Sequence, residues 1–336
     1  MLRVGLTYDL RQDYLDMGFG EEETAEFDSP RTIEGLETAL ADLGFAVERV
    51  GHVKKLAEKL VGGARWDFVF NICEGVSGLG RESQVPCLLD AYGIPYVFSD
   101  PLTTALTLDK AMAKKVLAHD GVPTADFVLL TDAAQAKAVT LPFPLFAKPV
   151  AEGSGKGVGP ASKASNHVEL EAVTADLIRQ FHQPVIVETY LPGREFTVGI
   201  VGEGKTARVI GIMEVIFDTA ATANGYGYDN KQHWEGKIGY ELVTDPEAVA
   251  AGDVALAGWR SLRCRDGGRA DVKSDAAGRP HFIEVNPLAG LHPDYSDLVF
   301  LSNFAGWRYR DLIGAITDAF LTRHPALAAR HVRAAA

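Results

Sequence analysis

Three oxygen-bearing side chains near the C-terminal end lie in two apolar, strand-like runs. Asp271 follows Arg269 in the first run, Glu284 and Asn286 lie in the second, and a turn-forming stretch at 275–278 separates them. Because side chains alternate along a strand, Glu284 and Asn286 point the same way, and a hairpin would bring Asp271 to that face. Two carboxylates and an amide oxygen suit Mg²⁺ shared with nucleotide phosphates. The alternative is a polar face on a surface hairpin.

A glycine-rich loop follows a strand-like run that carries Lys148. The residues of this loop that could contact an anion are Gly153, Ser154, Gly155 and Lys156. Glycines let backbone N–H groups approach an anion closely, and the serine and lysine add donors. The loop matches neither the P-loop nor the dinucleotide fingerprint. A flexible turn is the alternative, but a lysine inside an apolar strand is costly without a partner such as a phosphate.

A short connector between two strand-like runs is a candidate purine site. In it, Glu188 and backbone groups can hydrogen-bond a base, and Glu195 can bind ribose hydroxyls. Tyr190 and Leu191 can cover the ring. The alternative is an interdomain hinge with solvated glutamates.

The first hundred residues alternate strand and helix signals. Strands are expected at 4–8, 46–50, 68–71 and 94–98, and helices from Ser29-Pro30 to Leu43 and before Gly93. This alternation predicts a parallel sheet with helices on both faces. The acidic stretch 13–26 is expected to be a long loop. Beyond residue 107 the pattern is α+β with more antiparallel pairing, which suggests domains at 1–106, 107–192 and 193–336.

Composition narrows the class of protein. The chain has 336 residues, of which 47% are hydrophobic and 23% charged. A net charge of −12 argues against a nucleic-acid partner, and no apolar run is long enough to span a membrane. Cys73, Cys87 and Cys264 form no metal motif, so we expect a reducing cytoplasm and apolar packing roles. We expect small-molecule substrates and a homodimer.

Six motifs in order resemble the ATP-grasp superfamily and, within it, the D-alanine–D-alanine ligase family. The resemblance covers nearly the whole chain, and its motifs lie at 108–110, 147–149, 152–154, 188–198, 269–271 and 284–290. It implies an α/β and α+β chain with the ATP-grasp fold and an N-terminal parallel α/β (pre-ATP-grasp) domain. It also implies an ATP-dependent carboxylate–amine ligase that forms a dipeptide or related amide through an acyl phosphate, releasing ADP and phosphate.

The resemblance also implies roles for individual residues. Lys110 and Lys148 would hold the α- and β-phosphates of ATP, and the loop 153–157 would close over the γ-phosphate. The adenosine contacts would be Glu188, Leu191 and Glu195. The ligands of two Mg²⁺ ions, replaceable by Mn²⁺, would be Asp271, Glu284 and Asn286. The groups acting on the reacting atoms would be Arg269, the Gly290 N–H, Ser154 and Lys231.

The departures from the family pattern lie on the substrate side. The usual histidine is absent, its region being replaced by Asn71-Ile72-Cys73-Glu74, and a usual tyrosine is replaced by Gln232. The residues expected near the substrates are Glu26, Glu74, Arg81, Glu82, Gln232 and Ser296. Their charges favour a substrate with a further polar or charged group over D-alanine. The alternative is that they pair with each other at a domain interface.

Two other functions stay open at this point. One is a ligase with a non-amino-acid acceptor, and the other is a regulatory protein that binds nucleotide without turnover. The set Arg269, Asp271, Glu284, Asn286 and Gly290 argues against the second, because a sensor needs no oxyanion donor.

Overall fold

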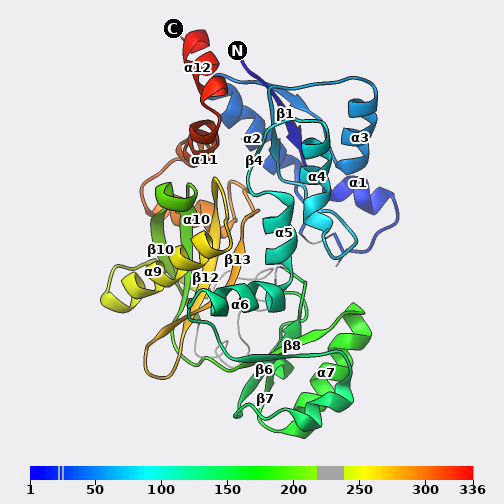
Figure 1. Ribbon diagram of the computed structural model, residues 1–336, viewed down its shortest axis with the longest axis vertical. Coiled ribbons are helices and arrows are strands. Elements are labelled where there is room, and N and C mark those ends of the chain that lie inside the picture. Colours follow the sequence, from blue (N-terminus) through cyan, green and yellow to red (C-terminus); the bar gives the residue numbers. More distant parts are fainter. Residues whose placement is uncertain (22, 25, 154, 218–237, 336) are drawn as a thin grey trace.

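The fold is seen in a computed structural model, which describes residues 1–21, 23–24, 26–153, 155–217 and 238–335. Three sheets follow one another along the long axis of the molecule. The N-terminal domain lies at the top of Figure 1, a five-stranded sheet lies in the middle, and a small four-stranded lobe lies at the bottom. Among the described residues, no helix is both long and apolar enough to cross a membrane.

The N-terminal sheet is parallel, with the strand order β2-β1-β3-β4. Its strands are β1 (Arg3–Thr7), β2 (Ala46–Arg49), β3 (Phe68–Asn71) and β4 (Tyr96–Val97). The helices of this domain are α1 (Arg11–Asp16), α2 (Pro30–Asp42), α3 (Val53–Val61), α4 (Gln84–Ala91) and α5 (Pro101–Leu108). Helix α2 begins as predicted, with the Ser29 side chain accepting from Thr32 N and Pro30 in the first turn. The predicted parallel sheet is confirmed.

The acidic stretch 13–26 was expected to be a long loop, and this was wrong for its first part. Residues Arg11–Asp16 form helix α1. Tyr14 on this helix is buried, its ring lies 4.5 Å from that of Phe27, and its hydroxyl donates to Asp9 Oδ1 at 2.5 Å. The helix is too short to be stable alone, so these tertiary contacts are what hold it.

The small lobe is an antiparallel sheet in the order β5-β8-β6-β7, with one long helix packed on it. Its strands are β5 (Phe127–Leu130), β6 (Leu145–Pro149), β7 (Lys163–Ala164) and β8 (Val185–Thr189). Helix α6 (Lys110–His119) precedes the lobe, and helix α7 (His167–Phe181) packs against β6. Strand β6 carries Lys148, and β8 carries Glu188, so the two side chains come from neighbouring strands.

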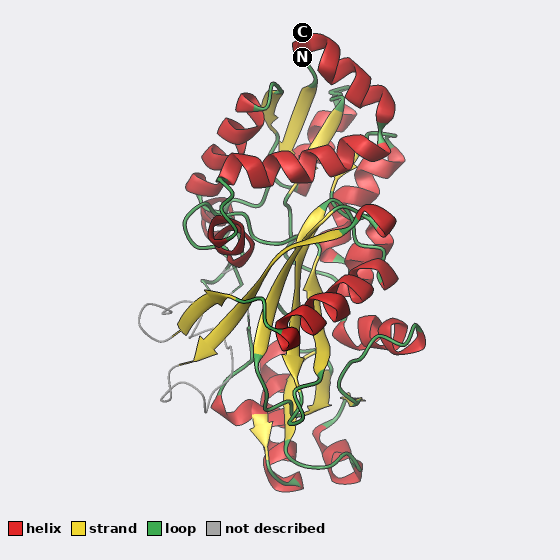
Figure 2. Cartoon of the chain, turned by 90° about the vertical axis from the view of Figure 1, so that its left-hand side faces the viewer, coloured by secondary structure: helices red, strands yellow, loops and turns green. Residues whose placement is uncertain are grey.

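The central sheet is antiparallel, in the order β11-β10-β9-β12-β13. Its strands are β9 (Glu195–Val201), β10 (Arg208–Phe217), β11 (Ile238–Leu242), β12 (Gly267–Ser274) and β13 (Pro280–Asn286). Helix α9 (Pro246–Ser261) packs against it, as Figure 2 shows. Strands β12 and β13 pair with Asp271 opposite Glu284. The predicted hairpin is therefore confirmed.

The last helices return to the N-terminal domain. They are α10 (Asp297–Phe304), α11 (Tyr309–Arg323) and α12 (Pro325–Ala335). Leu2, Leu36 and Phe68 of the N-terminal domain share one buried core with Ile313 and Phe320 of α11. Both chain ends consequently lie at the same end of the molecule (Figure 2).

Arg323, at the end of α11, ties these helices to the rest of the chain. Its guanidinium contacts both oxygens of Asp266, at 3.0 and 2.7 Å, and donates to the carbonyls of Tyr96 and Phe98. Asp266 is fully buried and also accepts from Phe98 N at 2.7 Å. Burial raises the pKa of Asp266, and Arg323 opposes that shift.

Replacing Arg323 by leucine should lower the free energy of unfolding by about 3 kcal/mol at neutral pH, because it leaves the Asp266 carboxylate buried without its cation. Without Arg323 the pKa of Asp266 in the folded state rises further, so the deficit should grow as the pH rises and shrink as the pH falls. Urea denaturation at pH 5 and pH 8 measures both effects. Arg308→Leu, at an exposed ion pair with Asp311, is the matched control. Equal losses in the two variants would contradict the prediction.

Candidate active site

A cavity of about 440 Å³ lies between the small lobe and the central sheet. Nearly all residues assigned from sequence to the nucleotide and metal line it: Lys110, Lys148, Gly155, Lys156, Glu188, Tyr190, Leu191, Glu195, Asp271 and Glu284. They come from both sheets, the start of α6, the glycine-rich loop and the connector after β8. The fold thus gathers residues that are far apart in the sequence around one space.

Two buried lysines hold the carboxylate of Glu188. Lys114 Nζ lies 2.6 Å from one oxygen and Lys148 Nζ lies 2.9 Å from the other. Burial alone would raise the pKa of Glu188, but the two lysines outweigh it and bring that pKa to about 2. Burial lowers the pKa of Lys114, whereas for Lys148 the carboxylates of Glu188 and Glu284 outweigh burial and raise the pKa. Lys148 therefore stays cationic at the cavity wall.

Lys114 was missed in the sequence, although a signal was present. It lies one helical turn after Lys110 on α6, and it is only 1% exposed. Residues four apart share a helix face, so a lysine at this spacing from a ligand lysine was a candidate. Since both oxygens of Glu188 contact lysines, the assignment of Glu188 to the adenine base stays a prediction.

The connector after β8 lines the cavity as expected. Leu191 is buried, and the half-buried Tyr190 ring has Lys163 Nζ 4.1 Å from its centre. Glu195 forms an ion pair with Lys273 on β12. If a purine ring lay between Leu191 and Tyr190, its ribose would be near Glu195. The ribose hydroxyls would then share the Glu195 carboxylate with Lys273.

The glycine-rich loop closes toward the N-terminal domain. Gly155 and Gly157 have φ values of 71° and 72°, which glycine adopts without strain. Lys156 is 7% exposed, and its Nζ lies 3.2 Å from Glu26 and 3.6 Å from Glu152. Three residues given roles from sequence lie outside the described residues: Ser154, Lys231 and Gln232.

The hairpin brings two of the three expected metal ligands, Asp271 and Glu284, to this cavity, whereas Asn286 is not among its lining residues. Asp271 contacts Arg269 and accepts from Thr197 Oγ1 at 2.9 Å, and Glu284 lies 3.3 Å from Lys110 Nζ. The amide nitrogen of Asn286 is buried without a hydrogen-bond partner in the described part of the chain. The described residues contain no group of three His, Cys, Asp or Glu side chains placed to hold a metal. The oxygens of two carboxylates and one amide are still of the type that a hard cation shared with phosphates prefers.

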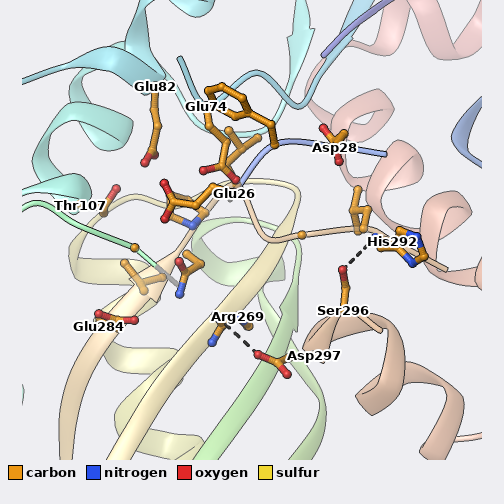
Figure 3. Close-up of a pocket in the computed structure, with 18 of the residues that line it drawn as sticks. Glu26, Asp28, Glu74, Glu82, Thr107, Arg269, Glu284, His292, Ser296 and Asp297 are labelled. Atoms are coloured by element: carbon orange, nitrogen blue, oxygen red, sulfur yellow. Dashed lines mark hydrogen bonds and ion pairs between the residues drawn. The ribbon is translucent and has the colours of Figure 1, made fainter. Parts of the chain in front are cut away.

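A second cavity, of about 220 Å³, adjoins the first beneath the N-terminal domain. The two cavities share the lining residues Lys110, Glu152 and Glu284. Figure 3 shows Arg269, Ser296 and His292 on one side of this second cavity and Glu26, Glu74 and Glu82 on the other. A substrate here would lie next to the phosphate end of a nucleotide in the first cavity.

The C-terminal side of the second cavity is built around the turn before α10. Ser296 Oγ accepts from His292 N at 2.8 Å, so its hydroxyl proton can point elsewhere. Arg269 reaches Asp297 at 3.6 Å. The Gly290 backbone lines the cavity, and no described residue accepts a hydrogen bond from its N–H. The roles of this N–H and of Arg269 as donors to a group in the cavity stay predictions.

The charged residues of the N-terminal side divide into two kinds. Arg81 is not among the residues that line the cavity: it lies 3.7 Å from Glu26 and donates to Ala151 O at 3.0 Å. Glu74 and Glu82 line the cavity and form no ion pair with described residues. The alternative reading was that the charged residues on the substrate side pair with each other. Among the described residues of that set, only Arg81 and Glu26 do so.

Comparison with known proteins agrees with this arrangement. The sequence model of the family described as D-ala D-ala ligase C-terminus matches residues 116–318. A D-alanine–D-alanine ligase of Bordetella petrii is 31% identical over 272 residues, which are 79% of this chain and 78% of that protein. The chain belongs to the D-alanine–D-alanine ligase family. As a member of this family it is an ATP-dependent ligase.

Solved structures agree on the ATP-grasp fold. The D-alanine–D-alanine ligase of Bacillus anthracis complexed with ATP aligns with a TM-score of 0.70 at 22% identity, covering 97% of this chain and 99% of that one. The VanG D-Ala:D-Ser ligase of Enterococcus faecalis aligns with a TM-score of 0.72 at 18% identity, covering 95% and 99%. The fold class expected from the sequence is confirmed.

Proposed function

We propose that this ligase activates the carboxylate of one amino acid with ATP and joins it to the amine of a second, releasing ADP and phosphate. The observation that carries the proposal is the wall shared by the two cavities. Lys110, Glu152 and Glu284 line both, so a nucleotide in one and a carboxylate in the other would meet beside Lys110. Phosphoryl transfer requires this proximity.

In the first step, a carboxylate oxygen attacks the γ-phosphorus and the bond to the ADP oxygen breaks. Lys148 and Lys110 offset the negative charge on the phosphate oxygens, and both stand at the nucleotide cavity. Lys110 Nζ also donates to the carbonyl of Glu152. It therefore connects the phosphate end of the cavity to the glycine-rich loop, which would exclude water from the acyl phosphate.

In the second step, the amine nitrogen attacks the acyl carbon, loses a proton, and the carbon–oxygen bond to phosphate breaks. Negative charge develops on the acyl oxygen in the transition state. The Gly290 N–H and Arg269 are the donors that the cavity offers to this oxygen, and one such donor is worth roughly 3 kcal/mol. Ser296, beside Gly290, would contact the incoming amino acid.

Asp271, Glu284 and Asn286 would hold Mg²⁺, or Mn²⁺ in its place, and we propose two ions. A bound divalent ion supplies charge neutralisation at the phosphates. The match of hard oxygen ligands at the cavity edge supports this assignment. The homodimer expected from the sequence also stays a prediction, which sedimentation can measure.

A turnover mixture should contain ADP and inorganic phosphate, and no AMP. The reason is that Lys110 lies where the two cavities meet, so a carboxylate in the second cavity would attack the terminal phosphorus of a nucleotide in the first. Anion-exchange chromatography of the nucleotides measures this directly. AMP with pyrophosphate would overturn the acyl-phosphate mechanism, and stoichiometric ADP without an amide product would point to a hydrolase.

A further inference from the structure

The N-terminal side of the substrate cavity carries four carboxylates, which we call the acid wall. Its members are Glu26, Asp28, Glu74 and Glu82. They come from the segment before α2, the loop after β3 and the short turn Arg81–Ser83. Figure 3 shows Glu26, Glu74 and Glu82 pointing toward one another in the cavity.

One residue outside the cavity, Asp9, holds two of these segments through its carboxylate and its backbone carbonyl. Asp9 is 1% exposed, and its Oδ2 accepts from the backbone N–H groups of Glu74 and Gly75 at 2.9 and 2.8 Å. The carbonyl of Asp9 accepts from Asp28 N at 2.9 Å. The two segments that carry Glu74 and Asp28 are therefore tied to one buried residue by hydrogen bonds.

The charge of the acid wall exceeds that of the cations near it. Glu26 is matched by Lys156 at 3.2 Å and Arg81 at 3.7 Å. Among the described residues, Glu74, Glu82 and Asp28 have no ion pair. The other cations of the cavity already contact carboxylates: Lys110 contacts Glu284, and Arg269 contacts Asp271 and Asp297.

The pKa values of Glu74, Glu82 and Asp28 are raised, as expected for carboxylates that have too few cations beside them. Burial raises the pKa of Glu82 to about 7, with Arg81 opposing the shift. Burial, followed by the charges of Glu26 and Glu82, raises the pKa of Glu74 well above its ordinary value. Burial also raises the pKa of Asp28. Carboxylates in this state gain most from a ligand that brings positive charge.

We propose that the amino acid bound against the acid wall carries a second ammonium group on its side chain, as a basic amino acid does. This inference rests on the proposed function, which places an amino acid in this cavity. One α-ammonium can match only one of the three uncompensated carboxylates. A neutral side chain would bury the others without a partner, and an acidic side chain would add repulsion.

The test is ATP-dependent phosphate release with D- and L-amino acids, singly and in pairs, with mass spectrometry of the products. The panel contains alanine, glutamate, 2,4-diaminobutyrate, ornithine and lysine. We expect at least one basic amino acid to exceed alanine at least tenfold in kcat/KM, and glutamate to fall below alanine. Replacing Glu82 by glutamine should reduce the ratio of basic to alanine kcat/KM at least fivefold. Glu58→Gln, at an exposed position on α3, is the matched control and should leave the ratio unchanged.

The pH dependence separates this role from a merely structural one. The ratio of basic to alanine kcat/KM should rise from pH 6 to pH 8, because the cation binds the ionised carboxylate and ionisation increases through pH 7. The charged groups that face Glu82 are Arg81, Glu26, Lys110 and Glu74. Because Glu74 and Glu82 interact, the pH at the midpoint of this rise reports the titration of the pair and not of either residue alone. In Glu82→Gln the rise should shrink.

The outcomes are distinguishable. Phosphate release with alanine at or above the level of every basic amino acid would overturn this inference and leave the proposed function standing. No release with any amino acid, from protein whose melting temperature rises with ATP and Mg²⁺, would overturn the proposed function and this inference with it. A Glu82→Gln variant that melts normally and keeps the substrate ratio of the wild type would also overturn the inference.

Discussion

Glu284→Gln is expected to lower kcat by at least about a hundredfold while the fold stays intact. The substitution keeps the shape of the side chain and removes a negative charge at the wall where the two cavities meet. If Glu284 holds Mg²⁺, several kcal/mol of charge stabilisation are lost in phosphoryl transfer, and each 1.4 kcal/mol is about a tenfold change in rate. Phosphate release across a Mg²⁺ titration measures the effect. The half-saturating Mg²⁺ concentration should rise as well.

The control for this variant is Glu241→Gln, which changes an exposed carboxylate on β11 outside both cavities. It should leave kcat and the Mg²⁺ dependence unchanged. The melting temperature of Glu284→Gln should stay within a few degrees of that of the wild type, because Lys110 keeps its hydrogen bond to Glu152 O. Near-normal turnover with an unchanged Mg²⁺ requirement would show that the hairpin is a structural face.

Glu188→Gln is expected to lower the free energy of unfolding by about 3–5 kcal/mol at pH 7. The substitution leaves Lys114 and Lys148 buried beside a neutral amide, and both are less than a tenth exposed. Lys114→Met is the informative companion, because it leaves a one-to-one pair of Glu188 and Lys148 and should be much less damaging. Urea denaturation of the three proteins gives the comparison.

The sign of the pH effect follows from the lysines. Without Glu188, burial depresses their pKa values in the folded state, so the penalty is full at neutral pH and disappears as the pH rises toward about 10, the ordinary lysine value. The deficit of Glu188→Gln should therefore be smaller at pH 9.5 than at pH 7. In the wild type, the pKa of Glu188 is about 2, so its contribution is full above the ordinary carboxyl pKa and is lost as the pH falls from that value through about 2. A deficit of the same size at both pH values would argue against charge burial as its cause.

Much of the lining of the first cavity was predictable because its sequence signals are local. Ser29-Pro30 gives the start of α2, and the alternation around Asp271 and Glu284 predicts the hairpin that is seen. The glycine-rich loop and Lys148 also lie within a few residues of each other, so both could be recognised in one short stretch of sequence. Helix α3 was not predicted, although Val53, Leu56 and Leu60 have helical spacing and two of them are buried.

What escaped prediction depends on long-range contacts. Tyr14 stabilises α1 through Asp9 and Phe27. The charge of Arg81 is compensated by Glu26, which lies 55 positions earlier in the sequence. Because this pairing is long-range, the sequence could not show that the net charge left in the second cavity is negative. Cys87, expected to pack in an apolar region, is exposed, whereas Cys73 and Cys264 are buried.

The return of α11 to the first sheet has a consequence for the order in which the chain folds during synthesis. Leu2, Leu36 and Phe68 leave the ribosome long before the side chains that cover them, such as Ile313 and Phe320, are made. Until then the N-terminal domain exposes part of its apolar core, and this is the period when association with other nascent chains is most favourable. The small lobe has a core drawn from residues 130–187. It does not need residues from α11 to cover that core, so it can fold as soon as it emerges.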